Sequence, residues 1–451
     1  MKTVMIIAGE SSGELYGSLL ARELKQREPA MRIIGVGGER MREAGVELLS
    51  TISDAFGLVE AIASLKKIRD AYRRVVAAMR EESPGVLVLI DYPDFNLKIA
   101  AKAKSSGIPI LYYVSPQVWA WRRGRVKKIA KIVNRMAVIL PFEEQIYRDA
   151  GLPCAFVGHP IMEEIEAVLK SAVMSQQSLK KDNNQYPITN DQCPVTSVHK
   201  DSDQCPVTND FPVSDQCPMT NDLKDNDQCP VTGDFIDSRH KAFFKSALGL
   251  DPGKPLLALL PGSRPHELEK LLPVMLDVVR MIKNDTSGTF GGFQFFMPLA
   301  PNTDEQRYRL LFTQLGKEGV AVRKGGSVKT LAASDLAVVA SGTAALQTAF
   351  LEVPMVVVYK LSPLTFFLGR HIVKVSHISL VNILSGRTVV RELLQQEANP
   401  GEVVRELQRV RLDTGYREAM VSQYRTVRAQ FQGMSASSRV AAIVLEMTGL
   451  R

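Results

Sequence analysis

Two series of short apolar runs alternate with longer helical patterns along this chain, and this alternation limits the folds that it can adopt. Each run has the length and β-branched content of a buried strand, and strands that alternate with helices form parallel sheets. The sequence therefore predicts an α/β fold with two Rossmann-like domains that face each other across a cleft. The first series predicts strands at 3–8, 32–36, 86–90, 110–114, 136–140 and 154–157, and the second at 256–260, 293–297, 320–323, 336–340 and 355–359.

The length of 451 residues exceeds what one core normally holds and suits two domains with a remainder. We place the first domain at 1–165, an insertion at 166–240, the second domain at 241–400 and C-terminal helices at 401–451. Those last helices either cross back to the first domain or contact a partner chain. In the second case the protein would be a homodimer.

A repeat occupies the insertion. The letters Asp-Gln-Cys-Pro begin at Asp191, Asp203, Asp215 and Asp227, and four of the five cysteines belong to these units. Zinc sites use closely spaced ligand pairs, and the units hold almost no large apolar residue, so the pattern is typical of a disordered linker rather than of a metal or disulfide array. We expect that deleting residues 183–234 leaves the activity intact.

The net positive charge of the chain indicates an anionic binding partner. A net charge of +8 and a pI near 9.1 favour a phosphorylated substrate, an anionic lipid surface or nucleic acid. No apolar run approaches the roughly 18 residues of a spanning helix, and the run at 4–8 is too short for the core of an export signal. We therefore expect a cytoplasmic protein.

Two polar loops follow predicted strands of the first domain. In residues 8–14, Ala-Gly-Glu-Ser-Ser-Gly-Glu, a serine can cap the next helix and Glu10 lies at the sheet edge, although the loop lacks dinucleotide or P-loop spacing. In residues 91–96, Asp-Tyr-Pro-Asp-Phe-Asn, two carboxylates follow the most apolar strand. Asp91 can act as a general base while Asp94 organises the loop; the alternative is that both only cap the next helix, with Asp94 the better candidate for the cap.

Both tryptophans lie in residues 113–122, Tyr-Val-Ser-Pro-Gln-Val-Trp-Ala-Trp-Arg, and a basic stretch runs from 122 to 135. No aromatic residues are interleaved with these charges, so the stretch fits a phosphate or an anionic lipid better than nucleic acid; a solvated helix face is the plain alternative. Residues 56–68 are amphipathic and form either a membrane-interface segment or a core helix.

Two loops of the second domain suit a nucleotide. Residues 260–264, Leu-Pro-Gly-Ser-Arg, end a strand, and Arg264 can neutralise a leaving diphosphate. Residues 341–346, Ser-Gly-Thr-Ala-Ala-Leu, end a strand and open a helix, so that their free amides can hold phosphate oxygens. One turn further on, Gln347 can reach ribose hydroxyls.

These motifs, together with Gly-His-Pro at 158–160, closely resemble the lipid A disaccharide synthase family, and their order matches as well. The likeness runs from residue 1 to about 162 and from about 240 to the end. The tryptophan motif is highly specific, whereas the Ser-Gly-Thr loop alone fits many sugar-nucleotide enzymes.

The resemblance implies a GT-B type glycosyltransferase, bound peripherally to the cytoplasmic face of the inner membrane. Its reaction joins UDP-2,3-diacylglucosamine to 2,3-diacylglucosamine 1-phosphate (lipid X) and gives lipid A disaccharide 1-phosphate and UDP, for the Gram-negative outer membrane. Asp91 would be the catalytic base. The implied donor-binding residues are Gly262, Ser263, Arg264, Ser341, Gly342, Thr343, Ala344, Gln347, Asn382, Gln395 and Glu397; those at the acceptor or in the cleft are Glu10, Ser11, Ser12, Gly13, Asp94, Asn96, Ser115, Trp119, Arg122 and His159.

Three further expectations accompany this resemblance. The family usually has Glu where this chain has Gln347, which predicts weaker donor binding and a lower donor KM for Gln347→Glu. No metal or other cofactor is expected, because the two domains contain no Asp-x-Asp dyad and the six histidines are scattered. No nucleic acid partner is expected either. One alternative is a UDP-N-acetylglucosamine 2-epimerase or a soluble-acceptor UDP-sugar transferase. The other is a non-catalytic protein that binds RNA or docks on a membrane through residues 122–135.

Overall fold

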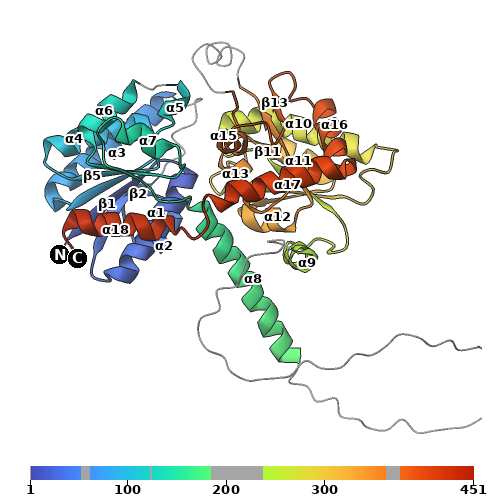
Figure 1. Ribbon diagram of the computed structural model, residues 1–451, viewed down its shortest axis with the longest axis horizontal. Helices are drawn as coiled ribbons and strands as arrows, with labels where there is room; N and C mark the ends of the chain where they lie inside the picture. The colour runs from blue at the N-terminus through green and yellow to red at the C-terminus, as the bar shows by residue number, and fades with distance from the viewer. Residues whose placement is uncertain (1, 52–60, 122–123, 184–236, 362–375, 451) are drawn as a thin grey trace, which may run out of the picture. The chain divides into compact units, whose positions relative to one another are not determined.

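The computed structural model of the chain describes residues 2–51, 61–121, 124–183, 237–361 and 376–450. Residues 1–172 and 236–451 form one unit and residues 173–235 another. Two parallel sheets build two lobes within the first unit (Figure 1). The predicted α/β fold with two Rossmann-like domains is confirmed. The repeat of the insertion lies outside the described residues.

The sheet of the first lobe has seven parallel strands in the order β3-β2-β1-β4-β5-β6-β7. They are β1 (Thr3–Ala8), β2 (Arg32–Gly37), β3 (Glu47–Thr51), β4 (Val86–Ile90), β5 (Ile110–Tyr113), β6 (Arg135–Val138) and β7 (Cys154–Phe156). The helices are α1 (Ser11–Arg27), α2 (Glu39–Glu43), α3 (Ala61–Glu82), α4 (Pro93–Ser105), α5 (Val118–Trp121), α6 (Arg125–Ile132) and α7 (Glu143–Arg148), and α8 (Ile161–Asn183) follows the last strand.

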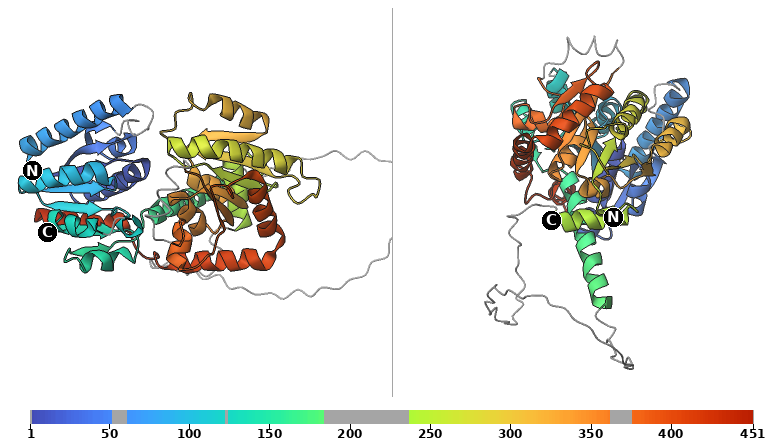
Figure 2. Two further views of the ribbon diagram at one scale, coloured as in Figure 1. Left: turned by 90° about the horizontal axis from the view of Figure 1, so that it is seen from above. Right: turned by 90° about the vertical axis from the view of Figure 1, so that its right-hand side faces the viewer.

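Helices cover both faces of this sheet because its strands are apolar on both sides. The buried residues of α3, α4 and α6 pack on one face, where Val75, Ile99 and Ile129 are in one core cluster with Leu87 of β4. On the other side α1 contacts α18 (Ala436–Thr448), and the two helices are labelled next to each other in Figure 1. Figure 2 shows the same elements from two further sides.

The sheet of the second lobe has six parallel strands in the order β10-β9-β8-β11-β12-β13. They are β8 (Leu256–Leu260), β9 (Gln294–Leu299), β10 (Val320–Lys324), β11 (Leu336–Ala340), β12 (Met355–Tyr359) and β13 (Glu392–Leu394). The helices are α9 (Ser238–Ala247), α10 (Pro265–Lys283), α11 (Arg309–Lys317), α12 (Ser327–Ala333), α13 (Thr343–Phe350), α15 (Leu380–Ser385), α16 (Pro400–Leu412) and α17 (Thr414–Ala429).

The end of the chain returns to the first lobe. Helices α16 and α17 pack on the second lobe, and α18 then lies against α1. Arg27 of α1 donates to Ser438 over 2.6 Å, and the guanidinium of Arg135 pairs with Glu446. The C-terminal helix therefore completes the packing of a lobe formed by the first third of the sequence.

Each strand predicted from the sequence overlaps an observed one, and two observed strands were missed. The missed strand β3 contains Glu, Ser and Thr and is partly exposed, so it lacks the apolar run of a central strand. The missed strand β13 has three residues, which is too short for a pattern to be seen.

Candidate active site

The predicted motifs gather where each sheet reverses its strand order. In the first lobe the order reverses between β1 and β4, whose following loops carry Glu10 and Asp91. In the second lobe it reverses between β8 and β11, whose following loops carry Arg264 and Ser341. Ligands of open parallel sheets bind beyond the carboxyl ends of the strands at such a switch point, so both lobes present their polar loops where a ligand is expected.

The backbone at Asp91 is held in a strained conformation. Asp91 and Tyr92 have φ of 48° and 45°, in the left-handed region that residues with a Cβ rarely adopt. The Asp91 carbonyl accepts hydrogen bonds of 2.7 Å from the Tyr112 hydroxyl and from the Asn96 amide. A Cβ at Gly9 would lie 2.4 Å from the Tyr92 Cβ, so only glycine fits beneath this turn. Such strain persists where its surroundings fix it, often at functional sites.

The Asp91 carboxyl has a pKa above the ordinary value for aspartate. Its pKa is raised from 3.8 to about 6, first by burial and then by the charge of Glu10, while the Tyr92 N–H and the Arg264 guanidinium act in the opposite direction. A base with a pKa slightly below neutrality is ionised at pH 7 and still basic enough to accept a proton as a bond forms. The pKa is compatible with the general-base role expected for Asp91, which stays a prediction.

Arg264 connects the two lobes. Its Nη2 donates to both carboxylate oxygens of Glu10, at 3.1 and 3.2 Å. The loop before it is fixed by the buried Glu267, which accepts from the backbone N–H groups of Ser263 and Arg264. A Cβ at Gly262, where φ is 99°, would lie 2.2 Å from a Glu267 oxygen. Because the Arg264 side chain is 51% exposed, it can still contact a ligand.

The turn at Ser341 leaves room for a ligand. A Cβ at Gly342 would meet nothing within 4 Å, and Gly342 is exposed. The Ser341 N–H donates to Val358 and its hydroxyl to the Ile378 carbonyl, which fixes the start of α13. The amides of Thr343 and Ala344 thus begin the helix at a partly exposed position, as the sequence predicted.

Tyr16 of α1 links the two sides of the site. Its buried phenol is hydrogen-bonded to the side chain of Thr343, and the charges of Glu164 and Asp91 raise its pKa after the larger effect of burial. Thr343 belongs to the second lobe and Asp91 to the first. The Asp91 carboxylate and the turn at 341–344 therefore lie within electrostatic reach of one side chain.

Gln347 makes a contact that the sequence did not predict. Its amide donates to Glu164 of α8 over 3.0 Å, and the other Glu164 oxygen lies 3.8 Å from Arg40. Gln347 is buried. Ribose binding by this residue stays a prediction, and a donor that uses it would compete with Glu164.

Ser115 and Trp119 are buried, and both donate to a residue that sequence reasoning missed. Glu143 at the start of α7 accepts from the Ser115 hydroxyl at 2.6 Å and from the Trp119 indole at 3.1 Å. Its only signal in the sequence is a position directly after a strand, in Pro-Phe-Glu-Glu at 141–144.

His159 lies in the connection between the lobes rather than in an open site. It is 1% exposed and its ring contacts those of Tyr16, Phe350 and Phe431. Its Nδ1 accepts from the Ile161 N–H, and burial lowers its pKa to about 3, so the ring is neutral. This enclosed, neutral ring fits a structural histidine, and an acceptor contact of His159 stays a prediction.

The three predicted residues after 380 have different positions. Asn382 is fully buried, donates to Val390 and Glu392, and accepts two backbone N–H groups, so a ligand contact would require these bonds to break. Gln395 has a φ of 51° and accepts from the Leu361 N–H, while Glu397 is exposed.

The remaining predicted residues of the first lobe are at the rim or outside the described residues. Asp94 is 79% exposed and lies 3.5 Å from Arg125. Gly13 packs beneath Ile90, and the N-cap of α1 is Glu10 without a side-chain capping bond. The prediction that Ser11 or Ser12 caps this helix is therefore wrong, because the helix already includes both. Arg122, residues 56–60 and the Ser11 side chain are not described.

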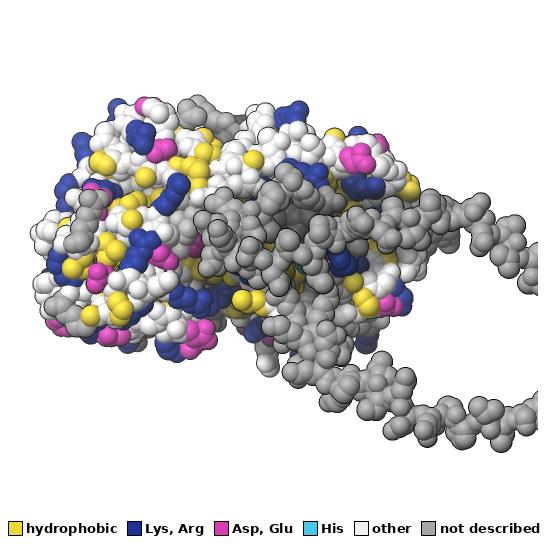
Figure 3. All heavy atoms as spheres, turned by 60° about the horizontal axis from the view of Figure 1, so that its bottom comes forward, with side chains coloured by type: hydrophobic (Ala, Val, Ile, Leu, Met, Phe, Trp, Pro, Cys, Tyr) yellow, Lys and Arg dark blue, Asp and Glu magenta, His cyan; other side chains and the backbone are white. Residues whose placement is uncertain are grey.

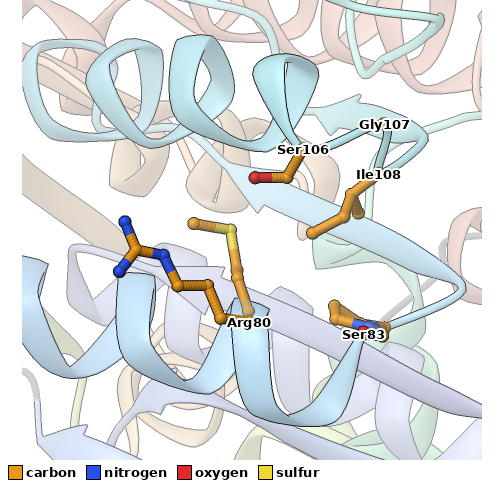
Figure 4. Close-up of a pocket in the computed structure, with 7 residues that line it drawn as sticks. Arg80, Ser83, Ser106, Gly107 and Ile108 are labelled. Atoms are coloured by element: carbon orange, nitrogen blue, oxygen red, sulfur yellow. The ribbon is translucent and has the colours of Figure 1, made fainter.

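A separate pocket of about 380 Å³ lies at the amino-terminal ends of β4 and β5 in the first sheet (Figure 4). It is lined by Met79, Arg80, Ser83, Pro84, Ser106, Gly107 and Ile108, which precede β4 and β5. Since Asp91 follows β4, the whole strand separates this pocket from the switch point. Among the described residues no group of three potential metal ligands occurs, and the expected lack of a metal stays a prediction.

A protein-family model for lipid-A-disaccharide synthetase matches residues 4–190 and 230–444. The chain belongs to this family. The residues left unmatched between these two segments, 191–229, contain the first three repeat units and the start of the fourth. Lipid-A-disaccharide synthases of Trichlorobacter lovleyi and Myxococcus xanthus are 36% and 33% identical to it, over 99% and 98% of this chain and 97% of each relative.

Solved structures share the fold at low identity. A UDP-GlcNAc 2-epimerase from Neisseria meningitidis bound to UDP-GlcNAc superposes with a TM-score of 0.60 at 9% identity, covering 99% of this chain and all of the other. The glycosyltransferase of kitacinnamycin superposes with a TM-score of 0.51 at 14% identity, covering 99% and 98%. These likenesses concern the fold alone. Family membership makes the chain a glycosyltransferase of lipid A biosynthesis, with lipid-A-disaccharide synthase activity, and does not favour the epimerase alternative.

Proposed function

We propose that this chain joins UDP-2,3-diacylglucosamine to the 6-hydroxyl of 2,3-diacylglucosamine 1-phosphate, with Asp91 as the base. The family supports the reaction. The observation that supports the site is the pairing of Glu10 with Arg264 beside Asp91, because it brings the switch points of the two sheets together.

The chemical step is a single displacement. The acceptor O6–H proton passes to the Asp91 carboxylate as O6 attacks the anomeric carbon of the donor. The bond between that carbon and the phosphate oxygen breaks, its electron pair leaves with UDP, and the anomeric configuration inverts. General bases of this kind contribute about 10² to 10⁴ in rate.

Arg264 and the turn at 341–344 bind the diphosphate in this proposal. A guanidinium forms two parallel hydrogen bonds with phosphate oxygens, and the free N–H groups that begin α13 favour the same anion. The diphosphate would take over the guanidinium that Glu10 binds in the structure. Gln347, Asn382, Gln395 and Glu397 would act around the donor by contact or by holding these loops.

The acylated substrates require the protein to work at a lipid surface, and we assign this docking to α6 of the first lobe. Val126 and Ile129 of this helix are buried, whereas Lys127, Lys128 and Lys131 are exposed. Lysines near an anionic leaflet contribute about 1 kcal/mol each. Figure 3 shows a different face of the first lobe, on which Lys and Arg side chains lie among hydrophobic and acidic ones. No helix among the described residues is long and apolar enough to cross a bilayer.

One assay tests the reaction. The protein is incubated with both diacylated substrates in detergent, and UDP and the disaccharide are measured; UDP-N-acetylglucosamine alone is the control for epimerase activity. Disaccharide formation that disappears with Asp91→Asn supports the proposal, and epimerisation without disaccharide contradicts it.

A second assay tests the membrane surface. Lys127→Glu/Lys128→Glu should bind anionic vesicles less than the parent, while Lys329→Glu, on the exposed face of α12, should bind as the parent does. Equal loss in both variants would contradict docking through α6. The predicted homodimer has no support in these observations, and light scattering measures it.

A further inference from the structure

Glu143 has a buried carboxylate that accepts hydrogen bonds from three donors. It is 2% exposed, and it accepts from the Ser115 hydroxyl, the Trp119 indole and the Leu140 N–H, at 2.6, 3.1 and 3.3 Å. In the described part of the chain no Lys or Arg forms an ion pair with it. Because burying an unpaired carboxylate is unfavourable, a neutral or apolar residue would serve a purely structural role better.

The turn that Glu143 holds is strained and adjoins Asp91. Val114, a β-branched residue, has a φ of 66°, which is a genuine outlier for such a side chain. The turn comes directly after β5, and the N–H of Asp91 donates to the Tyr113 carbonyl, the last residue of β5, over 3.2 Å. A shift of the turn would therefore be transmitted directly to the backbone of Asp91.

The two bonds to Glu143 fix both ends of this turn. Ser115 is its second residue and Trp119 lies in α5, so one carboxylate oxygen clamps a span of five residues. The indole of Trp119 also packs edge-on against Phe142, with ring centres 5.1 Å apart. Strained turns persist only where the surroundings over-determine them, and Glu143 supplies the polar part of that constraint.

We propose that Glu143 is a positioning residue for the transfer reaction, whose carboxylate holds the turn from Val114 to Trp119 in place beside Asp91. It touches no reacting atom, and the proposal rests on the function proposed above.

The charge on Glu143 gives the proposal a readout. Burial raises its pKa to about 7, while the bonds from Ser115, Trp119 and Leu140 lower it. The titratable groups that face it are Tyr147 of its own helix, Cys154 of β7 and Asp91. When the carboxyl is protonated on the oxygen that accepts from Leu140, that oxygen becomes a donor and faces another donor, while the oxygen that accepts from Ser115 and Trp119 loses its charge but remains an acceptor. The clamp is therefore complete above about pH 7 and weakens as the pH falls through that value.

Three variants test the clamp. Glu143→Ala removes both bonds and should lower kcat/KM about a hundredfold, mostly through kcat, since a misplacement of about 1 Å costs that much. Glu143→Gln keeps one oxygen for Ser115 and Trp119 and should recover most of this loss. Glu144→Gln is the matched control: it is the next residue of α7, paired with Arg148, and should stay within about twofold of the parent.

Tryptophan emission provides a readout without substrate. In a Trp121→Phe background Trp119 is the one remaining tryptophan, and its emission should titrate near pH 7. Adding Glu143→Gln should abolish this titration, and adding Glu144→Gln should leave it. Circular dichroism at each pH establishes that the variants are folded.

Two results would overturn the proposal: a folded Glu143→Ala enzyme with parental kcat/KM, or Trp119 emission that titrates alike with and without Glu143. The second result does not depend on the proposed reaction, since the emission is measured on the free protein. Lack of disaccharide from the parent protein would instead contradict the function.

Discussion

Replacing Asp91 by Asn separates the chemical role of this carboxylate from its effect on stability. The pKa of Asp91 is raised from 3.8 to about 6, mainly by burial and then by Glu10. Roughly two pKa units at about 1.4 kcal/mol each make the ionised form about 3 kcal/mol less favourable in the folded chain than in the unfolded one. Asn removes that charge while it keeps nearly the same shape.

The sign follows from proton binding. Because the folded-state pKa lies above the unfolded value, the folded chain binds the proton more tightly, and the stability that this supplies is complete below about pH 4 and lost as the pH rises through about 6. Asp91→Asn should therefore be more stable than the parent at pH 8, by up to about 3 kcal/mol, and equal to it near pH 4. Its kcat should fall by about 10² to 10⁴ because the base is gone.

Urea unfolding at several pH values measures the stability, and UDP release measures the activity. Asp94→Asn is the control for stability, since it makes the same chemical change three residues away on a side chain that is 79% exposed. It should change the free energy of unfolding little at any of these pH values. An Asp91→Asn protein that is inactive and also less stable at pH 8 would refute the reasoning, because the carboxylate would then be stabilising the fold.

Three other predictions concern Arg264, Gln347 and the insertion. Arg264→Lys keeps the charge but loses the planar fork, so kcat/KM for the donor should fall about tenfold or more in steady-state kinetics. Gln347→Glu faces Glu164 with a second carboxylate and should destabilise the fold by about 1 to 3 kcal/mol, with recovery on adding Glu164→Gln, in a thermal unfolding series. The lower donor KM expected from the sequence should then appear only in that double variant. Deleting residues 191–229, which the family model leaves unmatched, should change UDP release less than twofold.

The sequence predicted the positions of the loops better than the contacts within them. Apolar runs locate strands, and a polar motif directly after a run must lie at the carboxyl edge of a parallel sheet. Glu10, Asp91, Arg264 and Ser341 were found in this way, and the structure brings the first three together. Periodicity alone could not give the strand order, which decides that these loops flank the switch points.

Hydrogen bonds between residues far apart in the sequence could not be predicted, because they produce no local sequence motif. Glu143 lies 28 residues from Ser115, and Glu164 lies 183 residues from Gln347, so neither pair is visible as a motif. For His159, the position after a strand fits either a site residue or a structural histidine, and the sequence could not show that aromatic rings from both lobes enclose it. Burial is a property of the assembled lobes, and sequence spacing does not report it.

The charges at the switch points explain why the two lobes must act together. Glu10 and Asp91 come from the first lobe and Arg264 from the second, and the guanidinium both binds Glu10 and opposes the rise in the pKa of Asp91. Without the second lobe, Asp91 would lose the one cation among its described influences and would hold its proton to a higher pH. The basicity of the carboxylate is thus set partly by the same side chain that is proposed to bind the leaving diphosphate, which couples proton acceptance in one lobe to donor binding in the other.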